Sequence, residues 1–172
     1  LPLAQVFALY MQFFCFAGNV SLGLSSNLKT ILADFMAFKP TFILAVPRIF
    51  EKIYNAASQK AGAGFKGRVF ADATQTAYDW SHAQQSGGSI PLALNAKHAL
   101  YNKLVYSSIM EVFGGHVEYA VSGGAPLDSS IAHFFNGVGL PLLEGYGMTE
   151  TCAPSSVNPT EGYKIGTIRL PL

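Results

Sequence analysis

Residues 116–151 read HVEYAVSGGAPLDSSIAHFFNGVGLPLLEGYGMTET and predict a strand, a helix and a second strand in succession. Apolar side chains alternate over 116–122, as they do in a strand with one buried face. Asp128 then supplies a capping oxygen for a helix that Gly137 is expected to end, and the apolar residues 140–143 predict the second strand. Because strand and helix alternate, this stretch predicts an α/β protein with a mostly parallel sheet flanked by helices.

The residues that precede this stretch repeat the same pattern. Residues 41–46 (TFILAV) are continuously apolar and lie between two prolines, which predicts a strand buried on both faces. Pro47 is favoured in the first turn of a helix, and an apolar stripe from Phe50 to Ala57 supports a helix there. The remaining predicted elements are a helix at 6–17, a strand at 19–24, a helix from Ser25 or Ser26 to Phe38, and helices at 68–84 and 92–113.

Composition restricts the class of protein. The chain has 172 residues, of which 50% are hydrophobic and 12% charged, so it is too apolar to be disordered. Its 11 basic and 10 acidic residues nearly cancel and form no basic run, which argues against a nucleic-acid partner. Cys15 and Cys152 lie far apart, unlike the cysteines of a disulfide scaffold, so we expect a cytoplasmic protein. The low charge indicates that other protein or lipid covers much of the surface, and we interpret the chain as an interior fragment.

The first apolar run raises the question of a membrane. Residues 6–17 (VFALYMQFFCFA) are apolar except for Gln12, but this run is too short to span a bilayer. No basic leader precedes it, which argues against a signal peptide. We therefore predict a helix buried inside a large α/β enzyme. Contact with a fatty ligand, or peripheral contact with the inner face of the membrane, is the alternative.

The loops at the carboxyl ends of the predicted strands are the candidate ligand site, because open α/β sheets bind ligands there. The turn at 123–125 lets a ligand approach the main chain closely. Tyr146 can stack on a planar base, Thr149 can hydrogen-bond phosphate oxygens, and Glu150 can hold Mg²⁺ together with phosphates. The candidate nucleotide-binding residues are Gly123, Gly124, Ala125, Glu144, Gly145, Tyr146, Gly147, Met148 and Thr149.

Three motifs resemble one family. SGGAPL at 122–127 and LEGYGMTET at 143–151 resemble the acyl-adenylate-forming, or AMP-binding, superfamily, and PTFILAVPRIFEKIYNAA at 40–57 resembles its bacterial long-chain fatty acid–CoA ligases. The resemblance implies fatty acid, ATP and CoA as substrates, with Mg²⁺ as cofactor, and formation of an acyl-adenylate and then an acyl-CoA. It also implies that Thr149 and Glu150 are catalytic and that Glu150 binds the metal.

The chain departs from that family at two positions. Gln5 stands where the LPLAHVF motif has His, and Arg169 replaces a turn glycine of GTVGRPL. The resemblance also places a phosphate-binding loop before residue 1 and a C-terminal domain after residue 172. We therefore expect residues 1–172 to be part of an N-terminal adenylation domain that is inactive alone. A medium-chain or aryl-acid ligase, or a noncatalytic lipid-associated or membrane-associated module, remains an alternative.

Other motifs suggest chemistry more weakly. Ser122 lies in AVSGG, near the G-x-S-x-G pattern of serine hydrolases, but the only downstream histidine, His133, lies on the next predicted helix. The glycine-rich loop 62–67 lacks the spacing of a phosphate-binding loop, so we interpret it as a connector. The four histidines, which have no clustered metal-ligand partners, are predicted to be surface or capping residues. They are His82, His98, His116 and His133.

Overall fold

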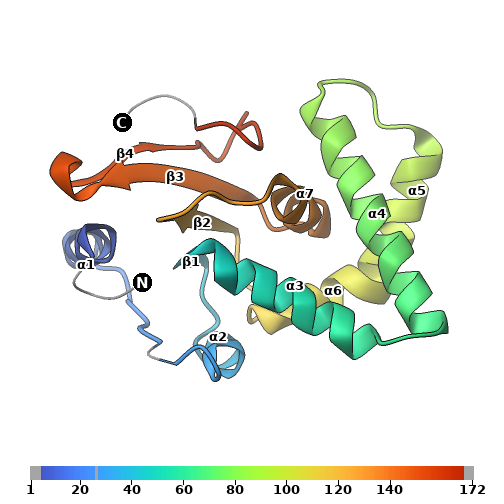
Figure 1. Ribbon diagram of the computed structural model, residues 1–172, viewed down its shortest axis with the longest axis horizontal. Helices are drawn as coiled ribbons and strands as arrows, with labels where there is room; N and C mark the ends of the chain where they lie inside the picture. Colours follow the sequence, from blue (N-terminus) through green and yellow to red (C-terminus); the bar gives the residue numbers. More distant parts are fainter. Residues whose placement is uncertain (1–4, 26, 169–172) are drawn as a thin grey trace.

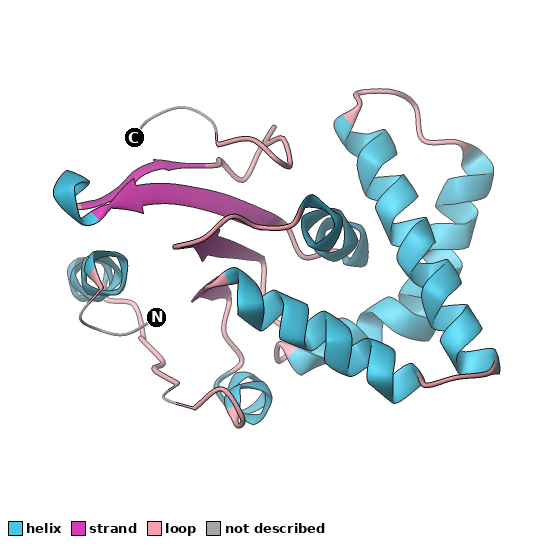
Figure 2. Cartoon of the chain, viewed as in Figure 1, coloured by secondary structure: helices cyan, strands magenta, loops and turns pink. Residues whose placement is uncertain are grey.

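The computed structural model describes residues 5–25 and 27–168 (Figure 1). Arg169 therefore lies outside the described residues. A four-stranded sheet forms the centre, with strand order β1-β2-β3-β4. The first three strands are parallel and β4 runs antiparallel to β3 (Figure 2), so the predicted α/β fold with a mostly parallel sheet is confirmed. The strands are β1 (Phe42–Ala45), β2 (Tyr119–Gly123), β3 (Leu142–Met148) and β4 (Ala153–Val157).

Helices cover both faces of this sheet. They are α1 (Val6–Gly18), α2 (Ile31–Phe38), α3 (Pro47–Ala61), α4 (Phe65–Gln85), α5 (Leu92–Tyr101), the π-helical turn η1 (Asn102–Tyr106), α6 (Ser107–Val112) and α7 (Ser129–Val138). Helices α3 and α7 share the main core with the sheet, and α4 and α5 lie beyond α7 (Figure 1). Helix α1 lies against the other face, near β4.

Aromatic side chains fill the core between α3, α6 and α7. Phe50, Phe113 and Phe135 are fully buried. The ring of Phe135 lies 5.8 Å from the ring of Phe50 and 5.9 Å from that of Phe113, edge-on in both cases. Burying one such side chain stabilises a fold by about 2–3 kcal/mol. These contacts fix α7, and therefore the turn that precedes α7, against the sheet.

Helix α7 begins as predicted and ends later than predicted. The Asp128 side chain accepts a hydrogen bond from the Ser130 backbone N–H at 2.7 Å, which satisfies an N–H group of the first turn. The helix ends at Gly139, whose φ of +103° is the left-handed conformation that favours glycine. Gly137 lies inside the helix instead, because α4 approaches so closely there that a Cβ would lie 2.1 Å from the Ala77 carbonyl oxygen.

Two predictions about the remaining elements are wrong. Residues 19–24 are not a strand, because no described strand pairs with them. Helix α2 begins only at Ile31, and Ser25 donates its hydroxyl hydrogen bond to the Asp34 carboxylate at 2.5 Å instead of capping the helix. Ser26, the other predicted cap, lies outside the described residues. The helix predicted over 92–113 forms as α5, η1 and α6 in succession, with a π-helical turn at η1.

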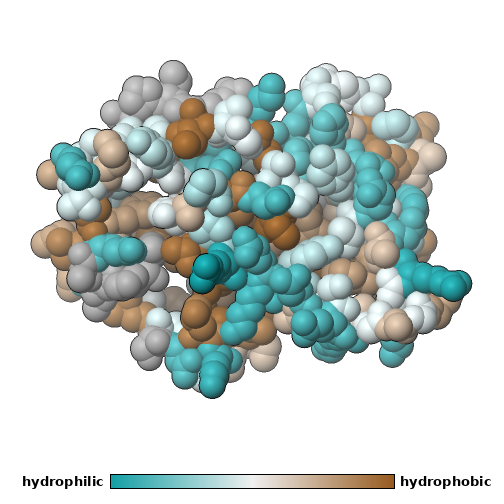
Figure 3. Space-filling view, in the orientation of Figure 1, coloured by the Kyte–Doolittle hydropathy of each residue, from teal (hydrophilic) through white to brown (hydrophobic). Residues whose placement is uncertain are grey.

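Helix α1 forms where it was predicted, and the described residues cover only part of its surface. Ala8 and Cys15 are buried, whereas Phe13, Phe14 and Phe16 are 65%, 56% and 83% exposed. Only one side of α1 contacts the described sheet, and apolar atoms reach the surface in this part of the molecule, at the left of Figure 3. None of the helices within the described residues is both long and apolar enough to cross a membrane.

Candidate functional site

The carboxyl ends of β1, β2 and β3 lie at one edge of the sheet because these strands are parallel. Gly123, the last residue of β2, is the register partner of Gly145 in β3. Ser122, one position earlier, pairs with both Ala45 and Glu144. Two motifs that are more than twenty residues apart in the sequence are therefore adjacent in the structure. The sheet places the glycine-rich turn beside the segment that contains Tyr146.

A residue from the N-terminal helix completes this edge. A Cβ on Gly123 would lie 2.6 Å from Phe7 Cε1, and a Cβ on Gly145 would lie 3.7 Å from Phe7 Cζ. The ring of Phe7 thus packs directly against the main chain at Gly123, which is possible only because Gly123 has no side chain, and it reaches ordinary contact distance of Gly145. Gln5, immediately before α1, is exposed and its side chain does not cap the helix.

The turn after β2 is exposed at its first residues and anchored in the core at its end. Gly124 has φ of +83°, a left-handed conformation that glycine adopts without strain. Gly124 and Ala125 are exposed, whereas Leu127 is buried in the core. Asp128 caps α7, and the hydrogen bond from the Ser130 hydroxyl lowers the pKa of that carboxyl. The main chain at 124–125 is therefore fixed in place and free to contact a ligand.

Strand β3 is longer than predicted and continues into a hairpin. Residues 144–148 belong to β3, and residues 145–148 pair with β4, with an irregular register between Tyr146 and Gly147. Sequence reasoning missed β4. Pro154 and two serines give it no apolar alternation, and proline is confined to edge strands such as this one. Tyr146 is 48% exposed, so its ring is accessible for stacking.

The hairpin ends in the tight turn η2 (Thr149–Thr151). Thr151 Oγ1 accepts a hydrogen bond from Met148 N at 3.1 Å and donates one to Met148 O at 2.9 Å. Cys152 has φ of +57° and its N–H bonds to Thr149 O at 3.1 Å. These contacts fix the backbone and leave the side chains of Thr149 and Glu150 exposed, without a hydrogen-bond partner among the described residues.

The structure brings together only part of the predicted site. The turn at 123–125 lies beside Gly145, as predicted from the strand order. The part of β3 from Gly145 to Met148 is about 10 Å long, and Thr149 and Glu150 follow it in a helical turn. They occupy the tip of the β3–β4 hairpin, at the left of Figure 1. A ligand that contacts both the turn and the hairpin tip must therefore be extended, as a nucleotide with its phosphates is.

The donor set at the hairpin tip is compatible with Mg²⁺. Magnesium is commonly bound by one or two carboxylates together with substrate phosphates, rather than by a cage of protein ligands. The described residues contain no group of three or more His, Cys, Asp or Glu side chains that could hold a metal ion alone. Glu150 offers one free carboxylate and Thr149 one free hydroxyl, which fits a metal ion that arrives with phosphates.

The serine hydrolase interpretation is wrong. Ser122 is 2% exposed, and its hydroxyl has no hydrogen-bond partner among the described residues. Ser122 belongs to β2 itself, where successive side chains point to opposite faces of the sheet. Because the Cβ side of Gly123 faces Phe7 on α1, the side chain of Ser122 faces α3 and α7 on the other side of the sheet. A nucleophile must instead face the substrate. The Nδ1 atom of His133 lies 2.9 Å from the hydroxyl of Ser81, not from that of Ser122.

One histidine differs from its prediction as a surface or capping residue. His133 is 8% exposed and lies between α7 and α4. His98 is half-buried and its ring is stacked 4.4 Å from the ring of Trp80. Its Nε2 lies 2.6 Å from Gly137 O, in the last turn of α7, which is a capping contact as predicted. His82 and His116 are exposed. No sequence motif marks these contacts, because they depend on how α4 packs against α5 and α7.

The fold and its strand-end loops define an α/β protein with a candidate ligand site at the carboxyl edge of the sheet. The chain belongs to the AMP-binding enzyme family, whose sequence profile matches residues 1–172.

Several relatives align with the whole chain. It is 45% identical over 172 residues to the long-chain-fatty-acid–CoA ligase FadD15 of Mycobacterium bovis, and covers 28% of that protein. It is 32% identical over 175 residues to long chain acyl-CoA synthetase 3 of Arabidopsis thaliana, and covers 26% of it. The chain thus spans about a quarter of the length of these relatives.

A solved structure also matches part of the chain. It is the A domain of carboxylic acid reductase from Segniliparus rugosus, in complex with AMP and a co-purified carboxylic acid. The match has a TM-score of 0.46 and 24% identity, and it covers 79% of this chain and 17% of that one.

Proposed function

We propose that the full-length protein carrying these residues is a long-chain fatty acid–CoA ligase. The observation that carries this proposal is the pairing of Gly123 with Gly145, which joins the SGGAP turn to the YGMTE hairpin. The 45% identity to a protein named as such a ligase supports the choice of a long-chain acid. A medium-chain or aryl-acid ligase is the nearest alternative within the same family.

The exposed groups of the turn and the hairpin can be assigned to the adenine, the phosphates and the metal ion of bound ATP. The ring of Tyr146 and the main chain at 123–125 would enclose the adenine, bordered by Glu144 and Gly145. The hydroxyl of Thr149 would donate to phosphate oxygens, with Gly147 and Met148 shaping the path between base and phosphates. Glu150 would hold Mg²⁺, which when bound neutralises charge on the phosphates. Without that cation the Glu150 carboxylate would repel the ligand that it faces.

The reaction requires positioning more than covalent help from the protein. The fatty carboxylate attacks the α-phosphorus of ATP, and pyrophosphate leaves. The CoA thiol then attacks the acyl carbon of the adenylate, and AMP leaves. The rigid turn and the braced hairpin tip would hold the phosphates in line for the first attack, which reduces its entropic cost. The donor at Thr149 would stabilise charge on the phosphoryl oxygens.

Exchange of pyrophosphate into ATP tests this function. The full-length protein should catalyse the exchange when palmitate and Mg²⁺ are present, and should form palmitoyl-CoA when CoA is added. Higher activity with benzoate than with palmitate would favour the aryl-acid alternative. Absence of acid-dependent exchange with any of these acids would contradict the assignment to an adenylating ligase.

A second candidate function is peripheral membrane contact through α1. The exposed side chains of Phe13, Phe14 and Phe16 favour it, because apolar side chains in water are normally covered by protein or lipid. In that case the protein would be cytoplasmic and would associate with the inner face of the membrane. Full-length protein should co-sediment with lipid vesicles, and replacing the three phenylalanines by serine should abolish this. Replacing Phe65, which is 82% exposed on α4, by serine provides the control.

A further inference from the structure

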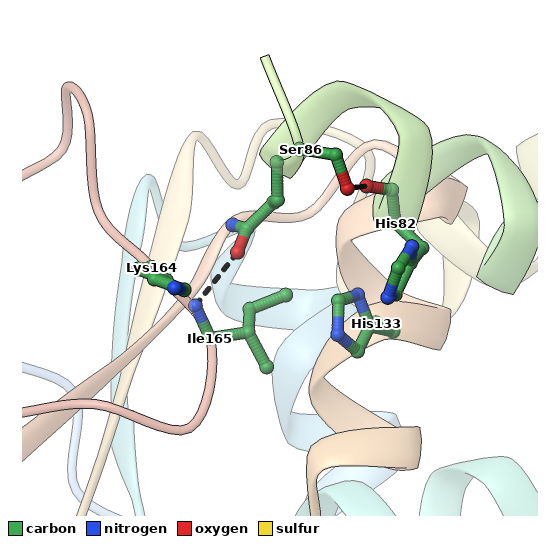
Figure 4. A pocket seen from close by; sticks show the side chains of 6 residues that line it. His82, Ser86, His133, Lys164 and Ile165 are labelled. Carbon is green, nitrogen blue, oxygen red and sulfur yellow. Dashed lines mark hydrogen bonds between the residues drawn. The ribbon is translucent and has the colours of Figure 1, made fainter. Parts of the chain in front are cut away.

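A hollow of about 260 Å³ lies between the end of α4, the middle of α7 and residues 164–165 (Figure 4). Helices α4 and α7 are well separated in Figure 1 from the hairpin tip that carries Thr149 and Glu150. Three of the six described residues that line the hollow carry basic or imidazole nitrogens, and none of the six is acidic. The lining residues are His82, Gln85, Ser86, His133, Lys164 and Ile165.

A chain of hydrogen bonds behind this wall orients its buried members. The Tyr163 hydroxyl donates to the Asn136 amide oxygen. Burial raises the pKa of Tyr163 to about 12, so this hydroxyl keeps its proton at neutral pH. The Asn136 nitrogen must then donate, and it does so to Ser81 Oγ at 2.8 Å and to Gln84 Oε1 at 3.2 Å. The amide orientation of Asn136 is thus fixed by its partners.

The last step of this chain fixes the tautomer of His133. Ser81 is fully buried and its Oγ lies 2.9 Å from His133 Nδ1. Among the described residues no other acceptor meets the Ser81 hydroxyl proton, so we assign that proton to the bond with Nδ1. The proton of the neutral imidazole is then on Nε2. Burial lowers the pKa of His133, which favours this neutral form. In Figure 4 the ring extends from α7 toward Ile165, so a buried N–H donor faces the hollow.

The side chains of Gln85 and Ser86 already form hydrogen bonds within the chain. The side chain of Gln85 clamps the opposite wall, because it donates to Tyr163 O at 3.3 Å and accepts from Ile165 N at 2.7 Å. The Ser86 hydroxyl donates to His82 O at 2.8 Å. The groups that remain to meet a ligand are His133 Nε2, the exposed ammonium of Lys164, and the His82 ring, whose centre lies 5.7 Å from that of His133. Two are donors and the third can be one.

We propose that this hollow is a binding site for a small oxyanion, of the phosphate or carboxylate class. A buried N–H, an ammonium and a second imidazole on converging walls provide charge-assisted hydrogen bonds to such a group. No described lining carboxylate repels it. The site is separate from the nucleotide site at the strand ends, and the proposal does not depend on the proposed ligase activity.

Titration of the full-length protein with inorganic phosphate, and separately with acetate, tests the proposal. AMP is kept at saturation so that the strand-end site is filled, and chloride keeps the ionic strength constant. We expect phosphate to bind calorimetrically and to raise the melting temperature. Binding of phosphate alone assigns a phosphate-bearing ligand, and binding of acetate as well extends the class to carboxylates. Binding of neither overturns the proposal.

Two conservative variants locate the binding. Lys164→Gln and His82→Gln change exposed side chains and should leave the fold intact. Loss of the ammonium should weaken phosphate binding about tenfold, the effect of one hydrogen bond to a charged group. Lys103→Gln, which changes an exposed lysine outside the hollow, should have no effect. Unchanged phosphate affinity in both Lys164→Gln and His82→Gln would overturn the proposal.

Discussion

The ring of Phe7 occupies the space in which a side chain on Gly123 would have to lie, with only 2.6 Å between a Cβ built on Gly123 and Phe7 Cε1. Real Cβ atoms do not approach other atoms so closely. This contact joins α1 to the strand end that carries the glycine-rich turn. The N-terminal helix therefore helps to set the position of the candidate nucleotide site, although it belongs to neither of the two motifs that form it.

Gly123→Ala should consequently reduce activity in the full-length protein. The new methyl group must displace Phe7 or the strand end, and a displacement of about 1 Å at a reacting site can cost about 100-fold in rate. The measurement is palmitate-dependent exchange of pyrophosphate into ATP. Combining Gly123→Ala with Phe7→Ala removes the clash and should restore a large part of the loss. A double variant no more active than Gly123→Ala alone would contradict this explanation.

Gly137→Ala should destabilise the protein. A Cβ at this position would lie 2.1 Å from the carbonyl oxygen of Ala77, and neither backbone can move without separating α4 from α7. Overpacking of this kind costs about 3 kcal/mol. The free energy of unfolding in urea checks this prediction. Gly88→Ala is the matched control, because no atom lies within 4 Å of a Cβ there. If the two variants had similar free energies of unfolding, α4 and α7 would have to lie further apart at Gly137 than the structure shows.

Asp128→Ala should lower stability in a pH-dependent way. The Asp128 carboxylate caps α7, and replacing such a cap by alanine costs about 1 kcal/mol. The pKa of Asp128 is below its ordinary value of 3.8 when the protein is folded. The stabilisation is therefore complete above that value and is lost as the pH falls through the lowered pKa. Urea unfolding should separate wild type from variant near pH 7, and the difference should shrink as the pH falls below 3.8 and through the lowered pKa.

The two cysteines provide an internal test of ligand position. Cys152 is exposed and directly follows the Thr149–Thr151 turn, whereas Cys15 is buried. ATP with Mg²⁺ should slow alkylation of Cys152 by N-ethylmaleimide at least several-fold, because the phosphates would cover the turn. Cys15 should react slowly with or without the nucleotide. Peptide mass spectrometry measures both positions in one sample, and equal labelling of Cys152 in both conditions would argue against nucleotide at the hairpin tip.

The parts of the fold that sequence predicted well depend on local signals. The apolar run before Pro47 specified β1 and the start of α3, and Asp128 specified the start of α7. The adjacency of the two glycine-rich motifs followed from one general property of parallel sheets, that their carboxyl ends share an edge. These features required no knowledge of how distant segments pack.

The parts that sequence did not predict depend on tertiary packing. Strand β4 exists because β3 offers an unpaired edge, and Pro154 gave no local sign of a strand. Sequence predicts a helix end at Gly137, whereas this glycine in fact leaves room for Ala77 of α4 to approach α7 closely. Spacing along the sequence does not reveal such a contact, because Ala77 lies on another helix. For the same reason, neither the contact of Phe7 with Gly123 nor the burial of His133 could be predicted from spacing.

Calorimetric titration of ATP in the presence of Mg²⁺ is the most direct test of the proposed nucleotide site. The full-length protein is compared with its Thr149→Ala/Glu150→Ala variant and with Thr160→Ala/Glu161→Ala, which changes an equally exposed Thr-Glu pair outside the hairpin. We expect the first variant to bind ATP at least about 100-fold more weakly, the loss of two charge-assisted contacts, and the second to bind normally. Unchanged affinity in Thr149→Ala/Glu150→Ala would contradict the proposed site.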